Sequence, residues 1–295
     1  MKIIDAHMHF FQADERFAQI AQNAGHLATP AHLAEAFAAN GVVLGIGMGT
    51  VGKEENREVA NPLTLAFPDG DEPPFLAYCL GIDTAAVTPE NREASLRAFE
   101  ERLAKPRAVG LKVYAGYQPY FVNDPVYHPF YELAEAYGVP VVIHTGDTAN
   151  SQGRLRYSHP LTVDEVAVNF PRVQFVMAHY GNPWIVDATE VAKKNPNVLI
   201  DLSGLAEGCF EPASFCEAYR GYLDMLRTWM TYLGAYDKLL YGSDWPLVNL
   251  ANYIELIARV VPKAQHAAVF YENAVRVFPK IKPLLAEAEE KREYF

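Results

Sequence analysis

The stretch KIIDAHMHF, residues 2–10, begins the chain with an apolar run that ends in two histidines one residue apart. In an extended strand, residues i and i+2 point to the same side, so we expect His7 and His9 to direct both imidazoles at one point. Asp5 lies one step earlier on the same face. Two converging imidazoles suit a zinc-like cation, although a histidine pair at a strand end can equally bond to nearby backbone. The rest of the chain has to decide between these interpretations.

Seven further short apolar runs follow this one, and most of them are continuously apolar rather than alternating. Continuous apolar strands are typical of parallel sheets that helices cover on both faces. The eight predicted strands span residues 2–8, 41–47, 74–81, 108–114, 139–144, 173–179, 197–203 and 238–243.

Helical patterns lie between these strands. Segment 29–41 has a Thr-Pro start and a glycine past its end, the residues that favour the two ends of a helix. Segments 88–105 and 124–138 begin with Thr-Pro and Asp-Pro and are predicted to be helical by the same reasoning. Further helices are predicted near residues 162–169, 185–194, 212–233, 249–260, 264–278 and 281–291.

Eight strands that alternate with helices over about 280 residues predict an α/β fold, a single (β/α)₈ TIM-type barrel. We assign one domain to residues 1–295, with a core of about 2–278 and a C-terminal helix over 281–291. A doubly wound open sheet is the alternative, but it would normally carry a Gly-rich phosphate turn where this chain has DAHMHF. Segment 48–73 is too long and polar for a tight connection. We interpret it as an insertion after strand two that crosses the barrel mouth, with a lid as one role.

The composition restricts the classes of function. The chain has 295 residues, half of them apolar, and a formal net charge of −11. An acidic surface repels phosphate backbones, so nucleic-acid binding is not expected. No apolar run approaches the roughly 18 residues of a membrane span and no leader precedes the first strand, so we expect a cytoplasmic protein with no membrane contact. The three cysteines form no CxxC pair and are expected to be reduced thiols. The oligomeric state stays open, a homo-oligomer included.

Polar residues end five of the predicted strands. Barrel enzymes build their sites at the C-terminal ends of their strands. A polar residue that closes an apolar strand costs desolvation free energy unless it binds another group, so such residues at five strand ends by chance are less probable than a site. They are His7 and His9 on strand one, Lys112 on strand four, His144 on strand five, His179 on strand six and Asp244 on strand eight.

The motifs HMH, GLK, IHTGD, AHYGN and YGSDWP occur in this order and resemble those of the amidohydrolase superfamily. More narrowly, they look like its amidohydrolase-related branch, which includes aminocarboxymuconate semialdehyde decarboxylase, lactone hydrolases and aromatic-acid decarboxylases. The run YENAVRVF, residues 271–278, is similar to a sequence near the C-terminus of that family. The resemblance spans Asp5 to about Phe278 and rests on the ordered set rather than on any one motif.

This resemblance implies one divalent metal ion, most often zinc. His7 and His9 match the strand-one ligands, and His144 and Asp244 match the ligands on strands five and eight. In mononuclear relatives the residue that matches His179 usually lies beside the substrate or the bound water instead of binding the metal. Lys112 matches a lysine that is carboxylated and bridges two metals in binuclear relatives, but in this branch it is more often unmodified. We therefore predict a mononuclear site, with a second metal only if this lysine is carboxylated.

The residue types support these roles on chemical grounds. Three imidazole nitrogens and a carboxylate suit zinc rather than Mg²⁺ or Ca²⁺. A zinc site lowers the pKa of its water to about 7. Asp244 is expected to accept the proton of that water and to pass it to the leaving group. His179 is expected to donate a hydrogen bond to the carbonyl oxygen as negative charge develops there.

We therefore predict a metal-dependent hydrolase of a small carboxylated ester, lactone or amide. The alternative on the same fold is a metal-dependent non-oxidative decarboxylase of a small unsaturated or aromatic acid, which the motifs do not separate. A non-enzymatic binding barrel is disfavoured because every metal-facing position is present. Over the mouth, Arg154 and Arg156 are candidates to clamp a substrate carboxylate, and Tyr114 is a candidate to line the pocket. Solvated loop charges and plain packing are the alternative interpretations of these three residues.

Overall fold

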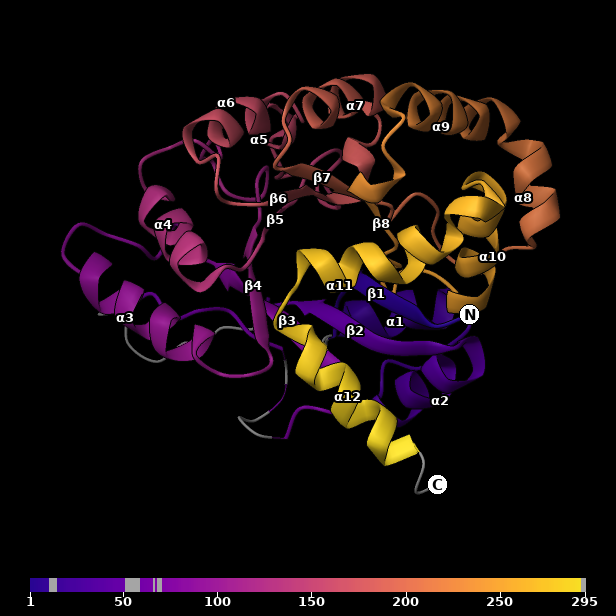
Figure 1. Cartoon of the computed structure of the whole chain (residues 1–295), viewed down its shortest axis with the longest axis horizontal. Helices are drawn as coiled ribbons and strands as arrows, with labels where there is room; N and C mark the ends of the chain where they lie inside the picture. The colour runs from indigo at the N-terminus through magenta and orange to yellow at the C-terminus, as the bar shows by residue number, and fades with distance from the viewer. Residues whose placement is uncertain (11–14, 51–58, 66, 68–70, 293–295) are drawn as a thin grey trace.

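Eight parallel strands form one sheet in the computed structural model, in the sequential order β1 to β8 (Figure 1). The structure describes residues 1–10, 15–50, 59–65, 67 and 71–292. All eight predicted strands are confirmed, with β5, β6 and β8 shorter than predicted. The strands are β1 (Ile3–Met8), β2 (Val42–Met48), β3 (Leu76–Ile82), β4 (Ala108–Val113), β5 (Val141–Ile143), β6 (Phe175–Met177), β7 (Val198–Asp201) and β8 (Leu239–Leu240).

The sheet closes into a barrel between its first strand and the segment that follows its last. Ala6 N donates a hydrogen bond to Tyr241 O at 2.9 Å. Asp244 N donates to His7 O at 2.8 Å, directly at the carboxyl end of β1. A closed barrel with sequential strand order is the predicted (β/α)₈ fold and excludes the doubly wound open sheet.

Helices lie between the strands and surround them (Figure 1). The second helix begins and ends as predicted, because the Thr29 hydroxyl accepts a hydrogen bond from His32 N and Gly41 takes a left-handed φ of 72°. The helices are α1 (Glu15–Asn23), α2 (Pro30–Asn40), α3 (Arg92–Leu103), α4 (His128–Tyr137), α5 (Leu155–Ser158), α6 (Thr162–Asn169), α7 (Ile185–Lys194), α8 (Pro212–Ala218), α9 (Arg220–Leu233), α10 (Leu250–Val260), α11 (Asn273–Val277) and α12 (Ile281–Arg292).

Three predicted helices have different ends in the structure. The predicted starts of α3 and α4, at Thr88 and Asp124, each lie ahead of the first helical residue. Thr88 and Asn91 hydrogen-bond each other in a turn before α3, so their side chains stabilise the turn instead of capping a helix at Thr88. The predicted helix over 212–233 is interrupted at Tyr219, whose φ and ψ of −105° and 27° are not helical, and it forms α8 and α9.

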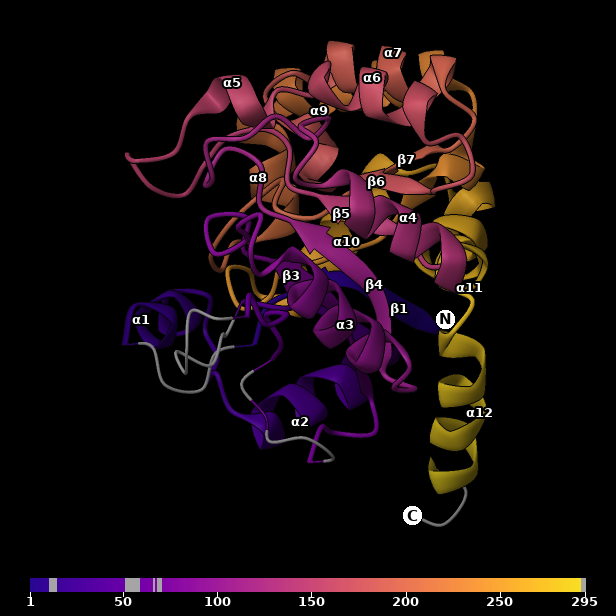
Figure 2. The same cartoon turned by 90° about the vertical axis from the view of Figure 1, so that its left-hand side faces the viewer.

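The two ends of the barrel are covered differently. The N-terminus and α12 lie near one end of the molecule, and α1 and α5 lie near the other (Figure 2). Phe278, Ile281 and Leu284, which follow α11 or lie on α12, belong to the same buried apolar cluster as Leu44 of β2 and Val142 of β5. The C-terminal helices therefore pack on the barrel strands, and the carboxyl ends of the strands stay available for a site.

The insertion predicted over 48–73 lies partly outside the described residues, which omit 51–58, 66 and 68–70. Its described part returns to the barrel, since Leu63 and Gly81 exchange two backbone hydrogen bonds of 2.9 Å at the end of β3. Its role as a lid stays a prediction.

Two further features bear on the sequence predictions. Within the described ranges, none of the helices combines the length and apolar character that crossing a bilayer requires. All three cysteines are free thiols, with Cys79 buried and Cys209 exposed.

Candidate active site

A buried carboxylate ties the carboxyl end of β1 to the segment after β8. Asp5 accepts hydrogen bonds from Ser243 N at 2.9 Å and from Ser243 Oγ at 2.5 Å. Burial raises the pKa of Asp5 to about 7, although these hydrogen bonds favour its ionised form. The tie places the residues that follow, His7 on one side and Asp244 on the other, next to each other.

Three potential metal ligands converge at this point. Asp244 Oδ1 lies 3.3 Å from His9 Nε2 and 3.7 Å from His7 Nε2. The ligand atoms of the three residues all lie within 4.8 Å of one another. Asp244 Oδ1 is buried without a hydrogen-bond donor, which costs free energy unless a cation or another donor pairs with it. Two imidazole nitrogens and a carboxylate oxygen in this arrangement fit a divalent ion such as zinc.

The charge states of these groups agree with metal binding. Burial, reinforced by the Lys112 ammonium, lowers the pKa of His7 to about 3, so this imidazole is neutral near pH 7. Burial opposes ionisation of Asp244, but His179 and His9 hold the pKa of this carboxyl well below its usual range. A neutral imidazole and an ionised carboxylate are the forms that ligate a metal ion.

The side chain of Lys112 contacts one of the convergent ligands, His7. Its Nζ is 3.4 Å from His7 Nε2, and its side chain is buried. Burial lowers the pKa of Lys112 to about 8, in spite of the nearby carboxylates of Asp201 and Asp244. The predicted strand-four lysine therefore faces the site.

Asp201, the last residue of β7, hydrogen-bonds to both His7 and His179. Its Oδ2 accepts a hydrogen bond from His7 Nδ1 at 2.7 Å, which leaves His7 Nε2 directed at His9 and Asp244. A second group of potential ligands comprises His7, His179 and Asp201, but there the carboxylate is already bonded to His7 Nδ1. We therefore assign Asp201 to orienting His7 rather than to binding the ion.

His144 and His179 face each other on the other side of the mouth. His179 Nε2 lies 3.1 Å from His144 Nδ1, and His179 Nδ1 lies 2.9 Å from Ser203 Oγ. His144 Nε2 donates to Asp147 O at 2.8 Å. Burial lowers the pKa of both histidines, and the proximity of the two rings lowers that of His144 further. His144 therefore lies at the site, but its ring nitrogens are not among the ligand atoms that converge with those of His7 and His9.

The backbone at both predicted catalytic residues is strained. His179, Tyr180 and Asp244 have φ values of 61°, 50° and 63°, in the left-handed region that non-glycine residues rarely adopt. Such a conformation costs about 1–3 kcal/mol per residue and persists only where the surroundings impose it. Here His179 N donates to Asp201 Oδ1 at 3.0 Å, and Asp244 N donates to His7 O. The strain coincides with the residues that face the mouth.

A cavity of about 160 Å³ opens above these groups. Three carboxylates line it, and among the described residues neither a lysine nor an arginine does. Burial, together with the nearby carboxylates of Asp244 and Asp147, raises the pKa of Glu207. The lining residues are Tyr117, His144, Asp147, Thr148, Ala149, His179, Asn182, Gly204, Glu207, Asp244 and Leu247.

The predicted substrate-binding residues do not reach this cavity. Arg154 and Arg156 are exposed, and Arg156 donates to the Tyr157 hydroxyl and stacks over its ring. The Tyr114 hydroxyl donates to Gly49 O at 2.8 Å. The carboxylate clamp stays a prediction that these positions do not support.

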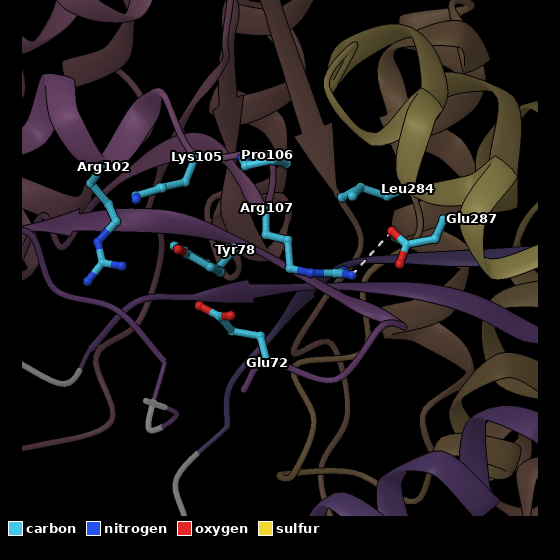
Figure 3. A pocket seen from close by; sticks show the side chains of 8 residues that line it. All are labelled: Glu72, Tyr78, Arg102, Lys105, Pro106, Arg107, Leu284 and Glu287. Carbon is cyan, nitrogen blue, oxygen red and sulfur yellow. Dashed lines mark ion pairs between the residues drawn. The ribbon is translucent and has the colours of Figure 1, made fainter. Parts of the chain in front are cut away.

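A larger cavity, of about 400 Å³, lies at the other end of the barrel (Figure 3). It is lined by residues before and at the start of β3, by residues from the end of α3 to the start of β4, and by residues of α12, among them the ion pair of Arg107 with Glu287 at 3.5 Å. No histidine or cysteine is among its described lining residues. Size alone would favour this cavity, but the potential ligands and the strained backbone lie at the smaller one.

Asp201 and Ser203 were missed as site residues by reasoning from the sequence. The signal was present in the run NVLIDLS, where a carboxylate and a hydroxyl close an apolar strand as the other site residues do. Neither residue belongs to a recognised ligand motif, and their importance follows only from their partners.

The chain matches the model of one known protein family. A family model described as amidohydrolase matches residues 4–280. No functionally curated protein matches the chain.

Solved structures share the fold at low sequence identity. An amidohydrolase from Burkholderia multivorans with bound zinc has a TM-score of 0.62 and 17% identity, over 95% of this chain and 99% of that chain. A probable 2-pyrone-4,6-dicarboxylic acid hydrolase from Acinetobacter baumannii with citric acid bound has a TM-score of 0.60 and 16% identity, over 95% and 100%. A 5-carboxyvanillate decarboxylase from Novosphingobium aromaticivorans, complexed with manganese and 4-hydroxy-3-methoxy-5-nitrobenzoic acid, has a TM-score of 0.61 and 14% identity, over 94% and 96%. Identities this low establish the fold alone.

Proposed function

We propose a hydrolytic function for this chain, which belongs to the amidohydrolase family. The substrate is a small ester, lactone or amide that carries a carboxylate, and the reaction depends on a divalent metal ion. The observation that carries the proposal is the convergence of the ligand atoms of His7, His9 and Asp244 within 4.8 Å. Hydrolysis by a metal-activated water is the chemistry that such a ligand set supports most directly.

The metal ion that we propose is zinc, one per chain. His7, His9 and Asp244 would hold it, with His144 as a further ligand by resemblance to the family. When bound, the ion supplies Lewis acidity that polarises a carbonyl group and activates water near neutral pH. Zinc and manganese in two structural relatives support a divalent ion, and the two imidazole ligands favour zinc. Lys112 is proposed to stay uncarboxylated and to contact His7 without binding the metal ion.

Asp244 and His179 are the proposed catalytic residues. The ionised Asp244 carboxylate accepts a proton from the attacking water and delivers it to the leaving oxygen or nitrogen. His179 lines the same cavity and donates a hydrogen bond from its ring to the substrate carbonyl oxygen, where negative charge develops. The distance of 3.9 Å between Asp244 Oδ2 and His179 Nδ1 supports the proposal that both side chains act on one small substrate.

The cavity restricts the substrate. A volume of about 160 Å³ admits only a small molecule. The carboxylates of Asp147 and Glu207 at its lining repel additional negative charge, so the substrate carboxylate is proposed to lie on the cation side, toward His7 and His9.

A second candidate function is decarboxylation of a small unsaturated or aromatic acid. The fold is equally similar to a decarboxylase and to a hydrolase. For this reaction a metal ion held by the same residues would supply the charge that binds the substrate carboxylate and a neighbouring oxygen, and Asp244 or His179 would protonate the carbanion that remains. The ligand residues do not separate the two reactions.

Metal analysis followed by a substrate screen tests both candidates. The purified protein is analysed for zinc and manganese and then incubated with lactones, acyl esters and hydroxybenzoates while CO₂ and acid release are measured. A new acid equivalent without CO₂ supports the hydrolase, whereas CO₂ release supports the decarboxylase. The Asp244→Asn variant serves as a control for contaminating activity. A fully metal-loaded protein that converts none of these compounds would contradict both candidates.

A further inference from the structure

A buried chain of hydrogen bonds leads from Asp201 through Ser203 to His179. Ser203 Oγ lies 2.5 Å from Asp201 Oδ1 and 2.9 Å from His179 Nδ1. Asp201 Oδ1 also accepts from the backbone nitrogens of Ser203 at 3.1 Å and His179 at 3.0 Å. Both Asp201 and Ser203 are almost completely buried, so water does not replace these partners.

Counting donors along this chain determines where the proton of His179 lies. Asp201 is an ionised carboxylate that only accepts hydrogen bonds, so the single hydroxyl proton of Ser203 points to it. The lone pair of Ser203 Oγ then faces His179 Nδ1, and the contact of 2.9 Å requires a proton on this nitrogen. Asp244 Oδ2, at 3.9 Å from Nδ1, is too distant to be an alternative acceptor.

The opposite nitrogen of His179 faces the ring of His144. Its Nε2 lies 3.1 Å from His144 Nδ1. His144 Nε2 donates to the carbonyl of Asp147, so a neutral His144 has only a lone pair on Nδ1. Two acceptor nitrogens face each other in the neutral state, and the space between them is suited to a proton or a cation.

We infer that Ser203 is the positioning residue for the proposed reaction. It holds one proton of His179 on Nδ1 and thereby makes Nε2, the nitrogen that faces His144, the one that gives or takes a proton. The transfer of a proton between His179 Nε2 and a substrate rests on the proposed function, whereas the assignment of the His179 tautomer does not. As a consequence, Nε2 is the ring nitrogen available for the hydrogen bond or proton transfer that the proposed function assigns to His179.

Nitrogen NMR of the histidine rings tests this inference. The protein is labelled with ¹⁵N-histidine, and long-range ¹H–¹⁵N spectra are recorded for metal-free and zinc-loaded samples at about pH 8, where an ordinary histidine is neutral. The signals of His179 are those that disappear in His179→Asn. We expect a protonated Nδ1 and an unprotonated Nε2 in the wild type, and a mixture of both tautomers in Ser203→Ala.

Ser243→Ala is the matched control. It removes an equally short buried bond of 2.5 Å, between Ser243 Oγ and Asp5, and does not contact His179. This variant should keep the wild-type tautomer, so a change confined to Ser203→Ala supports the inference. A proton on Nε2 in the neutral wild type, or an unchanged Nδ1 proton in a folded Ser203→Ala variant, would overturn it.

The wild-type spectrum decides the question even if Ser203→Ala does not fold. Because the spectra report a tautomer rather than turnover, they can contradict the role of Ser203 while the hydrolase proposal stands. A failed substrate screen would contradict the hydrolase proposal without altering the spectra.

Discussion

The two sides of the barrel mouth are built on different principles. On the side of β1 and β8, the ligand atoms of His7, His9 and Asp244 converge, and Asp244 Oδ1 is buried without a hydrogen-bond donor. On the side of β5 to β7, partners connect the side chains in sequence, from His144 through His179 and Ser203 to Asp201. The first side directs the lone pairs of potential metal ligands at one point. The second side fixes the orientation of the His144 and His179 rings through hydrogen bonds.

This difference assigns separate tasks to the two sides. A buried acceptor without a donor costs free energy, so a protein retains it where a cation supplies the missing charge. A chain of matched donors and acceptors instead fixes ring orientation and tautomer. Asp201 joins the two sides, since one of its oxygens bonds His7 and the other bonds Ser203 and His179 N. Substitutions of the ligands on the first side should reduce metal binding, and substitutions of His179 or Ser203 on the second side should reduce turnover.

The largest effect is expected from His7→Ala. This substitution removes one of the convergent ligands and the Nε2 lone pair that Asp201 orients. Substituting a residue that only hydrogen-bonds to a metal ligand typically lowers metal affinity roughly 10- to 100-fold. Because His7 is itself a proposed ligand, His7→Ala should lower the affinity by more than this and abolish turnover. Metal content after dialysis is the measurement, with His266→Ala as a histidine control, since His266 bonds to the backbone at Ala258 and Val261. Full metal retention by a folded His7→Ala would show that the β1 side does not bind the ion.

Two variants, one from each side of the mouth, compare the effects of the two sides on turnover and on metal content. Asp244→Asn keeps an oxygen that can ligate weakly but loses the basicity needed to move a proton, so turnover should fall about 10²- to 10⁴-fold while part of the metal remains. His179→Asn should lose a comparable factor with its metal content intact. Kinetics and metal content are measured on the same preparations. Near-native turnover of either metal-loaded variant would refute the catalytic role of that residue.

Asp201→Asn should have an intermediate effect, because this residue belongs to both sides. The amide preserves size but removes the charge that orients the His7 ring, so metal affinity should fall about 10- to 100-fold. A competition titration with a zinc chelator measures the change. Asp187→Asn, in the first turn of α7, provides a carboxylate control that is not among the residues lining the cavity. Unchanged zinc affinity in Asp201→Asn would restrict this residue to the His179 side.

The smallest effect is expected at Lys112. We predict that this lysine stays uncarboxylated and that added bicarbonate leaves the metal content near one ion per chain. Zinc analysis with and without bicarbonate, together with ¹³C NMR of protein incubated with ¹³C-bicarbonate, measures both quantities. A carbamate resonance that Lys112→Arg abolishes, together with a second bound ion, would establish a binuclear site and change the comparison of the two sides.

Much of the fold followed from local patterns. Continuous apolar runs predicted all eight strands, and the Thr-Pro and Gly signals predicted the ends of α2. The starts of α3 and α4 were predicted too early, because Thr88 and Asp124 satisfy turn hydrogen bonds before the helices begin. The interruption at Tyr219 had no signal in the helical periodicity of 212–233. Side-chain partners, rather than the type of residue alone, determine where an element ends.

The sequence by itself determined the predicted ligands and catalytic residues at the mouth, although not Asp201 and Ser203, because strand alternation and the shared direction of parallel strands are local rules. His7, His9, Lys112, His144, His179 and Asp244 all follow from those rules, and the structure brings them to one end of the barrel. Only the tertiary structure decided how each ring is turned. His7 and its partner Asp201 are separated by 194 residues, and neither carries a local signal for the other. Hydrogen-bond direction depends on both partners at once, so the division between a ligand side and a positioning side exists only in the folded barrel.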